Sequence, residues 1–152
     1  MRMREIGKFH SLQAIAFSAT LLAALLAPMA APAHAAASCG SLISPYHFTN
    51  KHRKAWLVLP DGRSLETRSG TPSTGTGTYG YAWIPSSKSG EYIWIDYSEN
   101  SHKDWVQCGL QAMSSTGPNY SRARFKAASS SVCIRAGYRY GGISYVTSWW
   151  CG

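Results

Sequence analysis

The sequence predicts an all-β fold, a small disulfide-stapled sandwich or barrel of about seven to nine short antiparallel strands. Aromatic and β-branched residues gather in short runs, and turn-forming glycine, proline, asparagine and serine separate these runs. No helical period extends over more than about two turns after the N-terminal segment, and no repeat recurs at a fixed spacing. All four cysteines follow that segment, which favours a domain held together by disulfide bonds.

The N-terminal segment, residues 1–35, has the parts of a secretory signal peptide. Its basic part contains Arg2, Arg4 and Lys8, and an apolar stretch follows at residues 14–26. That stretch is shorter than the roughly 20 apolar residues that span a bilayer. No later segment is apolar enough to span one, so the sequence predicts a secreted, extracellular protein without a membrane span after cleavage.

The predicted signal peptide ends in a cleavage site of the small-x-small form, Ala-His-Ala at residues 33–35. We therefore expect the mature chain to begin at Ala36. The remainder, residues 36–152, has the length of a single domain. The sequence thus predicts one secreted β-domain after the leader.

The cysteines Cys39, Cys108, Cys133 and Cys151 form an even set, which predicts two disulfides in an exported chain. A four-thiolate metal site would need close pairs such as Cys-x-x-Cys, and the sequence has none, so we expect no metal and no cofactor. Four cysteines allow three pairings, among which the sequence does not choose. We favour Cys108 with Cys133 and Cys39 with Cys151, because the second bridge would lock the ends of the domain together.

Two short strands joined by a tight turn are predicted early in the domain. Residues 51–54 form a basic cluster, residues 55–59 a β run and residues 63–68 the return strand. The Pro-Asp-Gly turn at residues 60–62 suits this connection, because proline presets φ and glycine accepts a positive φ. Residues 69–78 are rich in Gly, Ser, Thr and Pro, which predicts a polar loop.

The next strand, residues 79–83, alternates aromatic with small residues, so Tyr79, Tyr81 and Trp83 share one face. The chain has six tryptophans and nine tyrosines, more than a domain of this size usually hides. These residues combine an apolar body with a polar group, which suits them to interfaces and to stacking on sugar rings. We expect this face and Trp150 to be exposed and to bind a partner.

The central element is a hairpin that extends from residue 92 to residue 108. Its first strand alternates, so that Ile93, Ile95 and Tyr97 share the face expected to be core. A polar turn follows, and the β pattern then resumes in the second strand. Three tryptophans are also expected in the core: Trp94, Trp105 and Trp149.

The turn of this hairpin resembles the Asp-box, a Ser-x-Asp-x-Gly-x-Thr-Trp hairpin found in sialidases, other β-propellers and some secreted ribonucleases. Ser98 and Trp105 match the ends of the motif. Asn100 stands in place of the Asp and can still accept hydrogen bonds from backbone amides, whereas His102 replaces the Gly. The Asp-box is structural in its known settings, so the resemblance implies a hairpin and no catalytic site.

The last third of the domain contains a basic strand and a closing hairpin. Residues 120–127 carry Arg122, Arg124 and Lys126 on one face and apolar residues on the other, and residues 132–150 turn at a Gly-Gly pair. The whole chain has a net charge of +8, which favours association with wall polymers, lipid headgroups, nucleic acid or an acidic protein. We expect the basic strand to tune attraction to such an anionic partner.

The sequence offers no catalytic signature. Disulfide-bonded cysteines leave no thiolate, and no Gly-x-Ser-x-Gly motif marks a nucleophilic serine. The three histidines after the leader, His47, His52 and His102, lack the spacing of a zinc site. These observations favour a binding protein over an enzyme, with no catalytic residue assigned.

A small cationic ribonuclease or related hydrolase is the enzyme alternative. Such a reaction needs a carboxylate base, an acid such as histidine, and cations for the developing phosphorane charge. Glu91, Glu99, His102 and the basic strand supply these residue types. Nucleic acid is the partner in this alternative, and it is not the favoured one.

Three segments resemble small exported proteins of actinobacteria, most of which have no assigned activity: Ile-Trp-Ile-Asp-Tyr-Ser at 93–98, Trp-Val-Gln-Cys-Gly at 105–109 and Thr-Ser-Trp-Trp-Cys-Gly at 147–152. Some small exported proteins of streptomycetes are adaptors in antibacterial particles, the umbrella toxins, where they join a lectin subunit to a long toxin chain. The resemblance implies a secreted, non-catalytic binding or adaptor module of a toxin complex, and it transfers no site residue. The other binding alternative is a carbohydrate-binding or cell-wall-binding module. The expected partner is thus another secreted protein or a cell-surface polymer.

Overall fold

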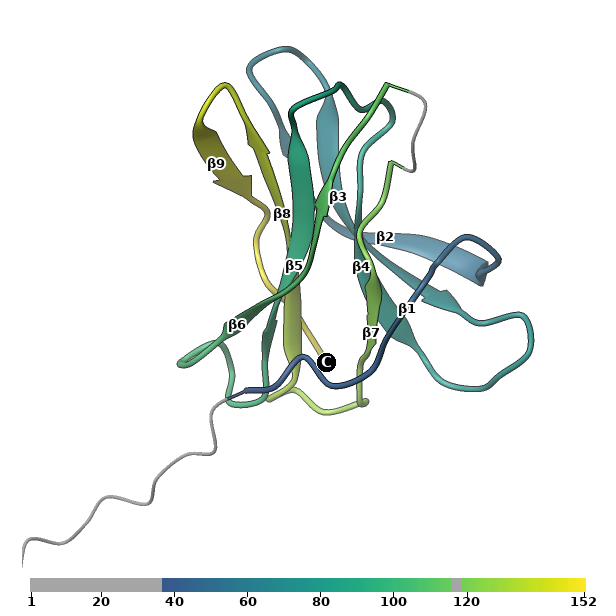
Figure 1. Cartoon of the computed structure of the whole chain (residues 1–152). Helices are drawn as coiled ribbons and strands as arrows, with labels where there is room; N and C mark the ends of the chain where they lie inside the picture. Colours follow the sequence, from purple (N-terminus) through teal and green to yellow (C-terminus); the bar gives the residue numbers. More distant parts are fainter. Residues whose placement is uncertain (1–36, 116–118) are drawn as a thin grey trace, which may run out of the picture. The chain divides into compact units, whose positions relative to one another are not determined.

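The computed structural model describes residues 37–115 and 119–152, and the predicted signal peptide and cleavage site lie outside them. The described part is all-β, which confirms the predicted fold class: its strands form two antiparallel sheets (Figure 1). It contains no helix long and apolar enough to cross a membrane. The strands are β1 (Leu42–Ile43), β2 (Thr49–Val58), β3 (Ser64–Thr71), β4 (Tyr79–Trp83), β5 (Tyr92–Ser98), β6 (Val106–Ala112), β7 (Ala123–Phe125), β8 (Cys133–Tyr140), β9 (Ile143–Val146) and β10 (Trp150–Cys151).

The two sheets have different strand orders. Sheet A has the order β1-β7-β4-β3-β2, and sheet B has the order β10-β8-β5-β6. One edge of β8 pairs with β5. Its other edge pairs with β10 at the beginning of β8 and with β9 at the end of β8. In Figure 1 the segment before β1 runs across the lower end of the sandwich towards β1.

The core between the sheets comes from the alternation of side chains along the strands. Ile93 and Ile95 of β5 are 0% exposed and Tyr97 is 3% exposed, which confirms the core face predicted for the central hairpin. Leu65 and Ala82 of sheet A are also fully buried and belong to the same cluster. Burial of the Ile93 side chain and of the Ile95 side chain each contributes roughly 1.5–3 kcal/mol to the free energy of folding.

The three tryptophans expected in the core have different surroundings. Trp94 is 6% exposed, but Trp105 is 52% exposed and Trp149 only partly buried, so the prediction is wrong for Trp105. Trp105 precedes the edge strand β6, where no neighbouring strand covers it. Its ring centroid lies 5.1 Å from the guanidinium carbon of Arg135, which is also 4.5 Å from the Trp149 centroid.

Side-chain to backbone hydrogen bonds hold the turn between β5 and β6. Ser98 Oγ accepts from the His102 N–H at 2.9 Å, and Asn100 Oδ1 accepts from the Asp104 N–H at 2.9 Å. Asn100 Nδ2 also donates to Asp104 Oδ2 at 2.8 Å. Ser101 and His102 have φ angles of 59° and 60°, so His102 takes the left-handed backbone that glycine adopts most easily.

The disulfides join Cys39 to Cys108 and Cys133 to Cys151, so the favoured pairing is wrong. Cys133 and Cys151 lie directly opposite each other on β8 and β10, with their Cα atoms 4.2 Å apart. The strands of Cys108 and Cys133 lie on opposite sides of β5. Two strand spacings amount to roughly 9.5 Å, which is too far for a disulfide.

The β2–β3 hairpin is longer than the sequence predicts. β2 already contains the basic cluster at residues 51–54, and β3 continues to Thr71, so only part of the polar loop predicted at residues 69–78 is loop. Gly70 permits this extension because Phe48 packs where another side chain would lie. A Cβ atom on Gly70 would be 2.8 Å from Cδ2 of Phe48.

Candidate functional surface

The outward side of sheet A carries a continuous set of aromatic and charged side chains, which we call the aromatic face. Neighbouring strands are paired in register, so their outward residues form rows across the sheet. In one row Trp56 of β2 is opposite Glu66 of β3, which is opposite Trp83 of β4. The aromatic face consists of Arg53, Trp56, Glu66, Arg68, Tyr79, Tyr81, Trp83 and Phe125.

Glu66, which is 5% exposed, holds two guanidinium groups that each lie over a tryptophan ring. Arg68 Nε donates to Glu66 Oε2 at 2.7 Å, and its guanidinium carbon is 3.8 Å from the centroid of the half-buried Trp83. Arg53 Nη1 lies 3.7 Å from Glu66 Oε1, and its guanidinium carbon is 4.6 Å from the Trp56 centroid. The hydrogen bond to Glu66 holds Arg68 over the Trp83 ring before any partner binds, whereas the exposed Arg53 is held less firmly.

A β-bulge explains why Arg53 and Trp56, three residues apart, share this face. In a regular strand residues at an odd spacing point to opposite faces. The register of β2 on β3 shifts directly after Arg53, so Lys54 is the extra residue of the bulge. The bulge in β2 cannot be recognised from the periodicity of the sequence. The two-residue spacing of Glu66 and Arg68, in contrast, predicts that these two side chains lie on the same face of β3.

Exposure differs along the aromatic face. Trp56 is 58% exposed and Phe125 is 42% exposed, and Tyr79 is half-buried. Tyr81 is only 2% exposed, so the expectation that it is available to a partner is wrong. Phe48 covers it, with ring centroids 5.9 Å apart, and burial raises the pKa of the Tyr81 phenol. Tyr81 therefore packs under Phe48 and is not exposed on the aromatic face.

Arg124 of β7 and Lys126 directly after it turn inward, which corrects the prediction of a basic surface at these two residues. Phe125 faces outward on the aromatic face, so the residues on either side of it face sheet B. The guanidinium carbon of Arg124 lies 4.8 Å from the Tyr97 centroid. Lys126 is 3% exposed, and its Nζ lies 4.9 Å from the centroid of Trp150, which is itself half-buried.

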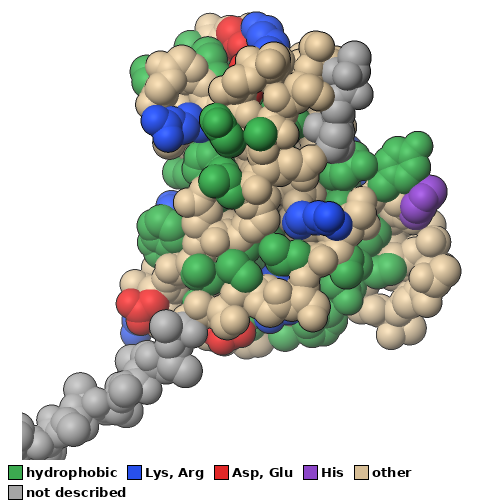
Figure 2. All heavy atoms as spheres, in the orientation of Figure 1, with side chains coloured by type: hydrophobic (Ala, Val, Ile, Leu, Met, Phe, Trp, Pro, Cys, Tyr) green, Lys and Arg blue, Asp and Glu red, His purple; other side chains and the backbone are tan. Residues whose placement is uncertain are grey.

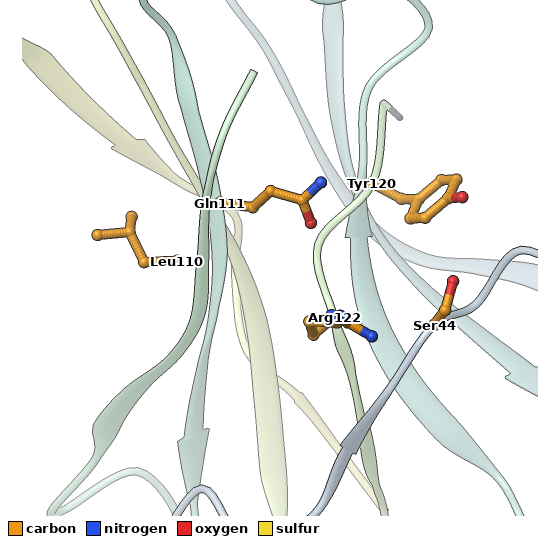
Figure 3. A pocket seen from close by; sticks show the side chains of 5 residues that line it. All are labelled: Ser44, Leu110, Gln111, Tyr120 and Arg122. Carbon is orange, nitrogen blue, oxygen red and sulfur yellow. The ribbon is translucent and has the colours of Figure 1, made fainter. Parts of the chain in front are cut away.

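Arg122 is exposed and lies in a different place, an open hollow of about 440 Å³ at the edge of the sandwich. Figure 3 shows Gln111 reaching across this hollow from β6, while Leu110 points away from it. Tyr120 links the hollow to the aromatic face because it forms an isolated bridge with Trp83. In Figure 2 a Lys or Arg side chain lies near the middle of this side of the molecule, among scattered hydrophobic side chains. The hollow is lined by Ser44, Leu110, Gln111, Tyr120 and Arg122.

Glu91, the first carboxylate of the ribonuclease alternative, is occupied by a buried network. It is 5% exposed, and Arg63 donates to both of its oxygens, at 2.6 Å and 2.9 Å. The Tyr138 hydroxyl and the Lys88 N–H also donate to Glu91 Oε2. A carboxylate that already accepts from these donors and lies out of solvent is poorly placed to act as a general base.

Two other residues of that alternative, Glu99 and His102, lie far from Glu91. Glu99 and His102 follow the last residue of β5, whereas Glu91 precedes its first. At about 3.3 Å per residue, the length of β5 separates Glu91 from Glu99 and His102 by roughly 20 Å or more. His102 stacks on Trp149, with ring centroids 5.8 Å apart. In residues 37–115 and 119–152 there is also no group of three His, Cys, Asp or Glu side chains that could hold a metal ion, and no free cysteine.

Comparisons with known proteins give no relative for this chain. No protein-family description matches it, and neither a curated protein nor a solved structure does. Its function must therefore be inferred from its own residues, and the aromatic face is the surface on which guanidinium groups lie over two tryptophan rings.

Proposed function

We propose that this protein is an exported, non-catalytic binding or adaptor module that binds another secreted protein through the aromatic face. The observation that supports this proposal most is the pair of tryptophans, Trp56 and Trp83, each covered by a guanidinium that Glu66 holds. Tryptophan, tyrosine and arginine are the residues most enriched where binding energy concentrates at protein interfaces.

Preorganisation of the aromatic face favours binding. Binding normally costs about 0.5–1.5 kcal/mol for each flexible side chain that becomes ordered. Arg68 is already hydrogen-bonded to Glu66 over its ring, so this cost is reduced for that side chain. The two arginines face one carboxylate, Glu66, which leaves a positive excess. The expected partner therefore has an apolar surface with acidic groups at its rim.

The adaptor form of the proposal draws on the resemblance of residues 93–98, 105–109 and 147–152 to small exported actinobacterial proteins. A protein that joins two others needs two separate surfaces. A sandwich supplies them, since the outer sides of its two sheets face in opposite directions. A component of a secreted antibacterial toxin complex is the partner that this resemblance suggests.

Affinity isolation from native culture supernatant tests the proposal. We expect the parent protein to bring down a stable partner and Trp56→Ala to retain at least about tenfold less of it, as for an interface anchor. Ile143→Ala is the matched control, because Ile143 is also 58% exposed but lies on β9, off the aromatic face. Equal recovery of the partner by Trp56→Ala, Ile143→Ala and the parent would show that the aromatic face is not the binding surface.

A carbohydrate-binding role is the second candidate, and a groove on sheet B favours it. The groove has a volume of about 380 Å³, and Tyr92, which is 40% exposed, lines it together with the polar residues Gln107 and Arg139. An exposed ring beside hydrogen-bonding groups suits a sugar. Retention on a polysaccharide, release by free sugar and loss of both in Tyr92→Ala would support this role over the first. The groove is lined by Tyr92, Trp94, Gln107, Leu110, Arg139 and Ser144.

A further inference from the structure

A hollow near β10 is smaller than the groove on sheet B and is separate from that groove and from the aromatic face. Its volume is about 200 Å³, below the range of about 300–1,000 Å³ that is typical of sites for drug-sized ligands. It lies at the side of Trp150, whose ring packs over Gly80 of β4. The hollow is lined by Lys54, Thr78, Lys126, Ala127, Ala128, Trp150 and Gly152.

Two ammonium groups lie close to the same ring in this hollow. Lys126 Nζ is 4.9 Å and Lys54 Nζ is 5.2 Å from the Trp150 centroid. Two separate features bring them together. The β-bulge in β2 makes Lys54 the extra residue of that strand, and the alternation through Phe125 turns Lys126 towards sheet B.

The charge of Lys126 is incompletely compensated. Lys126 is 3% exposed, and its Nζ donates to the carbonyl oxygen of Ala127 at 3.1 Å. An ammonium has three hydrogens to donate. Among the residues that the structure describes, no carboxylate forms a salt bridge with Lys126 or with Lys54. Burial, and then the charge of Lys54, lowers the pKa of Lys126.

A buried ammonium without a counter-ion is unfavourable, and a ring face offsets only part of that cost. An anion in the hollow that both lysines line would supply the missing negative charge. Lysine is a common phosphate ligand, which it binds as a point charge. Thr78, whose hydroxyl can donate to a phosphate oxygen, also lines the hollow.

We propose that the hollow formed by Lys54, Lys126 and Trp150 binds a phosphate group. The site is independent of the proposed protein partner, because the aromatic face lies on the opposite side of sheet A from the inward-facing Lys126. The phosphate can be free or can belong to a phosphodiester polymer, and both present the same anionic oxygens to the two lysines.

Calorimetric titration with inorganic phosphate in a phosphate-free, low-salt buffer tests the site. We expect the parent to bind phosphate and Lys126→Met to bind it at least about tenfold more weakly, because one of two charged contacts is lost. Lys103→Met removes the same charge from the exposed hairpin turn, and we expect it to bind within about twofold of the parent. Lys54→Met, which changes an exposed residue, should also weaken binding and guards against a folding defect in Lys126→Met.

Thermal unfolding gives a second readout that a merely structural lysine would not produce. Phosphate should raise the melting temperature of the parent and of Trp56→Ala, and should raise that of Lys126→Met less at the same concentration. Without phosphate Lys126→Met should be at least as stable as the parent, because a buried charge has been removed. If the parent binds phosphate no better than Lys126→Met, or if Lys103→Met loses as much affinity, the site is not there.

A soluble poly(glycerol phosphate) chain distinguishes the two sources of the phosphate group. Tighter binding per phosphate to this polymer than to inorganic phosphate, with the same dependence on Lys126, supports the site and identifies a phosphodiester polymer as its ligand. Binding to inorganic phosphate alone supports the site for the free anion. Binding of the polymer that Lys126→Met and Lys54→Met leave unchanged would overturn the proposal.

Discussion

A Cβ atom on Gly137 would lie 2.1 Å from Cε2 of Trp94, so the indole of Trp94 occupies the space that a side chain at position 137 would need. The two residues are paired across β5 and β8. This close approach lets the indole lie against the backbone of β8, and Trp94 Nε1 then donates to Asp96 Oδ1 at 2.9 Å. Arg135 Nε completes the arrangement by donating to Asp96 Oδ2 at 2.8 Å. Gly137 therefore allows the Trp94 ring to pack against β8 on the outer side of sheet B.

Gly137→Ala is expected to destabilise the domain by about 1–3 kcal/mol or more, because the new methyl group collides with the Trp94 ring. Urea unfolding followed by tryptophan fluorescence measures the free energy of unfolding. Gly75→Ala is the control, since its Cβ atom would meet nothing closer than Pro72 Cβ at 3.6 Å. An equal stability of Gly137→Ala and Gly75→Ala would contradict the close packing of Trp94.

The β5–β6 turn gives a second prediction. Asn100→Ala should destabilise the domain by about 1–2 kcal/mol, because its amide satisfies the Asp104 N–H and also donates to the Asp104 carboxylate. Trp105→Ala should cost less than the roughly 3–5 kcal/mol expected for a core tryptophan, because the ring is 52% exposed. Chemical denaturation of both variants checks this order. A Trp105→Ala variant that loses as much as a core tryptophan would mean that the ring is buried in solution.

The Arg63–Glu91 pair predicts how stability depends on pH. Burial is the largest influence on the Glu91 pKa and would raise it, but hydrogen bonds from Arg63, Tyr138 and the Lys88 N–H outweigh it, and the pKa lies below its ordinary value. Glu91 therefore contributes stability above the pKa of an unfolded glutamate, and this contribution is lost as the pH falls through the lowered pKa of the folded protein. Asp96 has the opposite sign: burial raises its pKa, so its protonation favours the folded state.

The free energy of unfolding, measured from about pH 7 down to about pH 3, checks the role of Glu91. Glu91→Gln should lose about 3 kcal/mol at neutral pH, because Arg63 is left with Asp61 as its carboxylate partner, and it should lose less than the parent on acidification. Glu99→Gln is the matched control, since Glu99 is exposed and only accepts from the Tyr97 hydroxyl. An acid profile of Glu91→Gln that equals those of the parent and the control would refute this assignment.

The disulfides predict two different losses of stability. Cys39–Cys108 spans 69 residues and Cys133–Cys151 spans 18. In the chain-entropy account these loops correspond to about 4 and about 3 kcal/mol. Paired alanine variants should therefore lose more at the first bridge, as measured by equilibrium unfolding. A peptide map of the unreduced protein should contain these two linked pairs, and a Cys108–Cys133 peptide would contradict the structure.

Local patterns were sufficient to predict much of the fold. The alternation through Ile93, Ile95 and Tyr97 identifies a core face because a sandwich strand buries one side. Gly141 and Gly142 predict the two-residue turn between β8 and β9, and both have positive φ angles, 58° and 81°. These features depend on neighbours in the sequence, so one chain is enough to reveal them.

Other features depend on contacts between distant segments. The alternation at β7 is visible in the sequence, but only the packing of sheet B decides that Arg124 and Lys126 face inward. Tyr81 shares a face with Tyr79 as predicted, yet Phe48 covers it from another part of the chain. The Cys133–Cys151 pairing likewise depends on β10 pairing with β8, which no local pattern encodes.

The positions of the two disulfides also determine how mechanical tension would pass through the domain. Tension applied to the chain before Cys39 and after Cys151 passes through the first disulfide to Cys108. It then follows residues 108–133 and reaches Cys151 through the second disulfide. Single-molecule stretching of the oxidised protein should release only that segment, and reduction should release the remainder. β2, β3 and β4 lie within the loop that the Cys39–Cys108 bridge closes. A partner held on these strands would stay attached to unstretched chain while the ends of the domain are drawn apart.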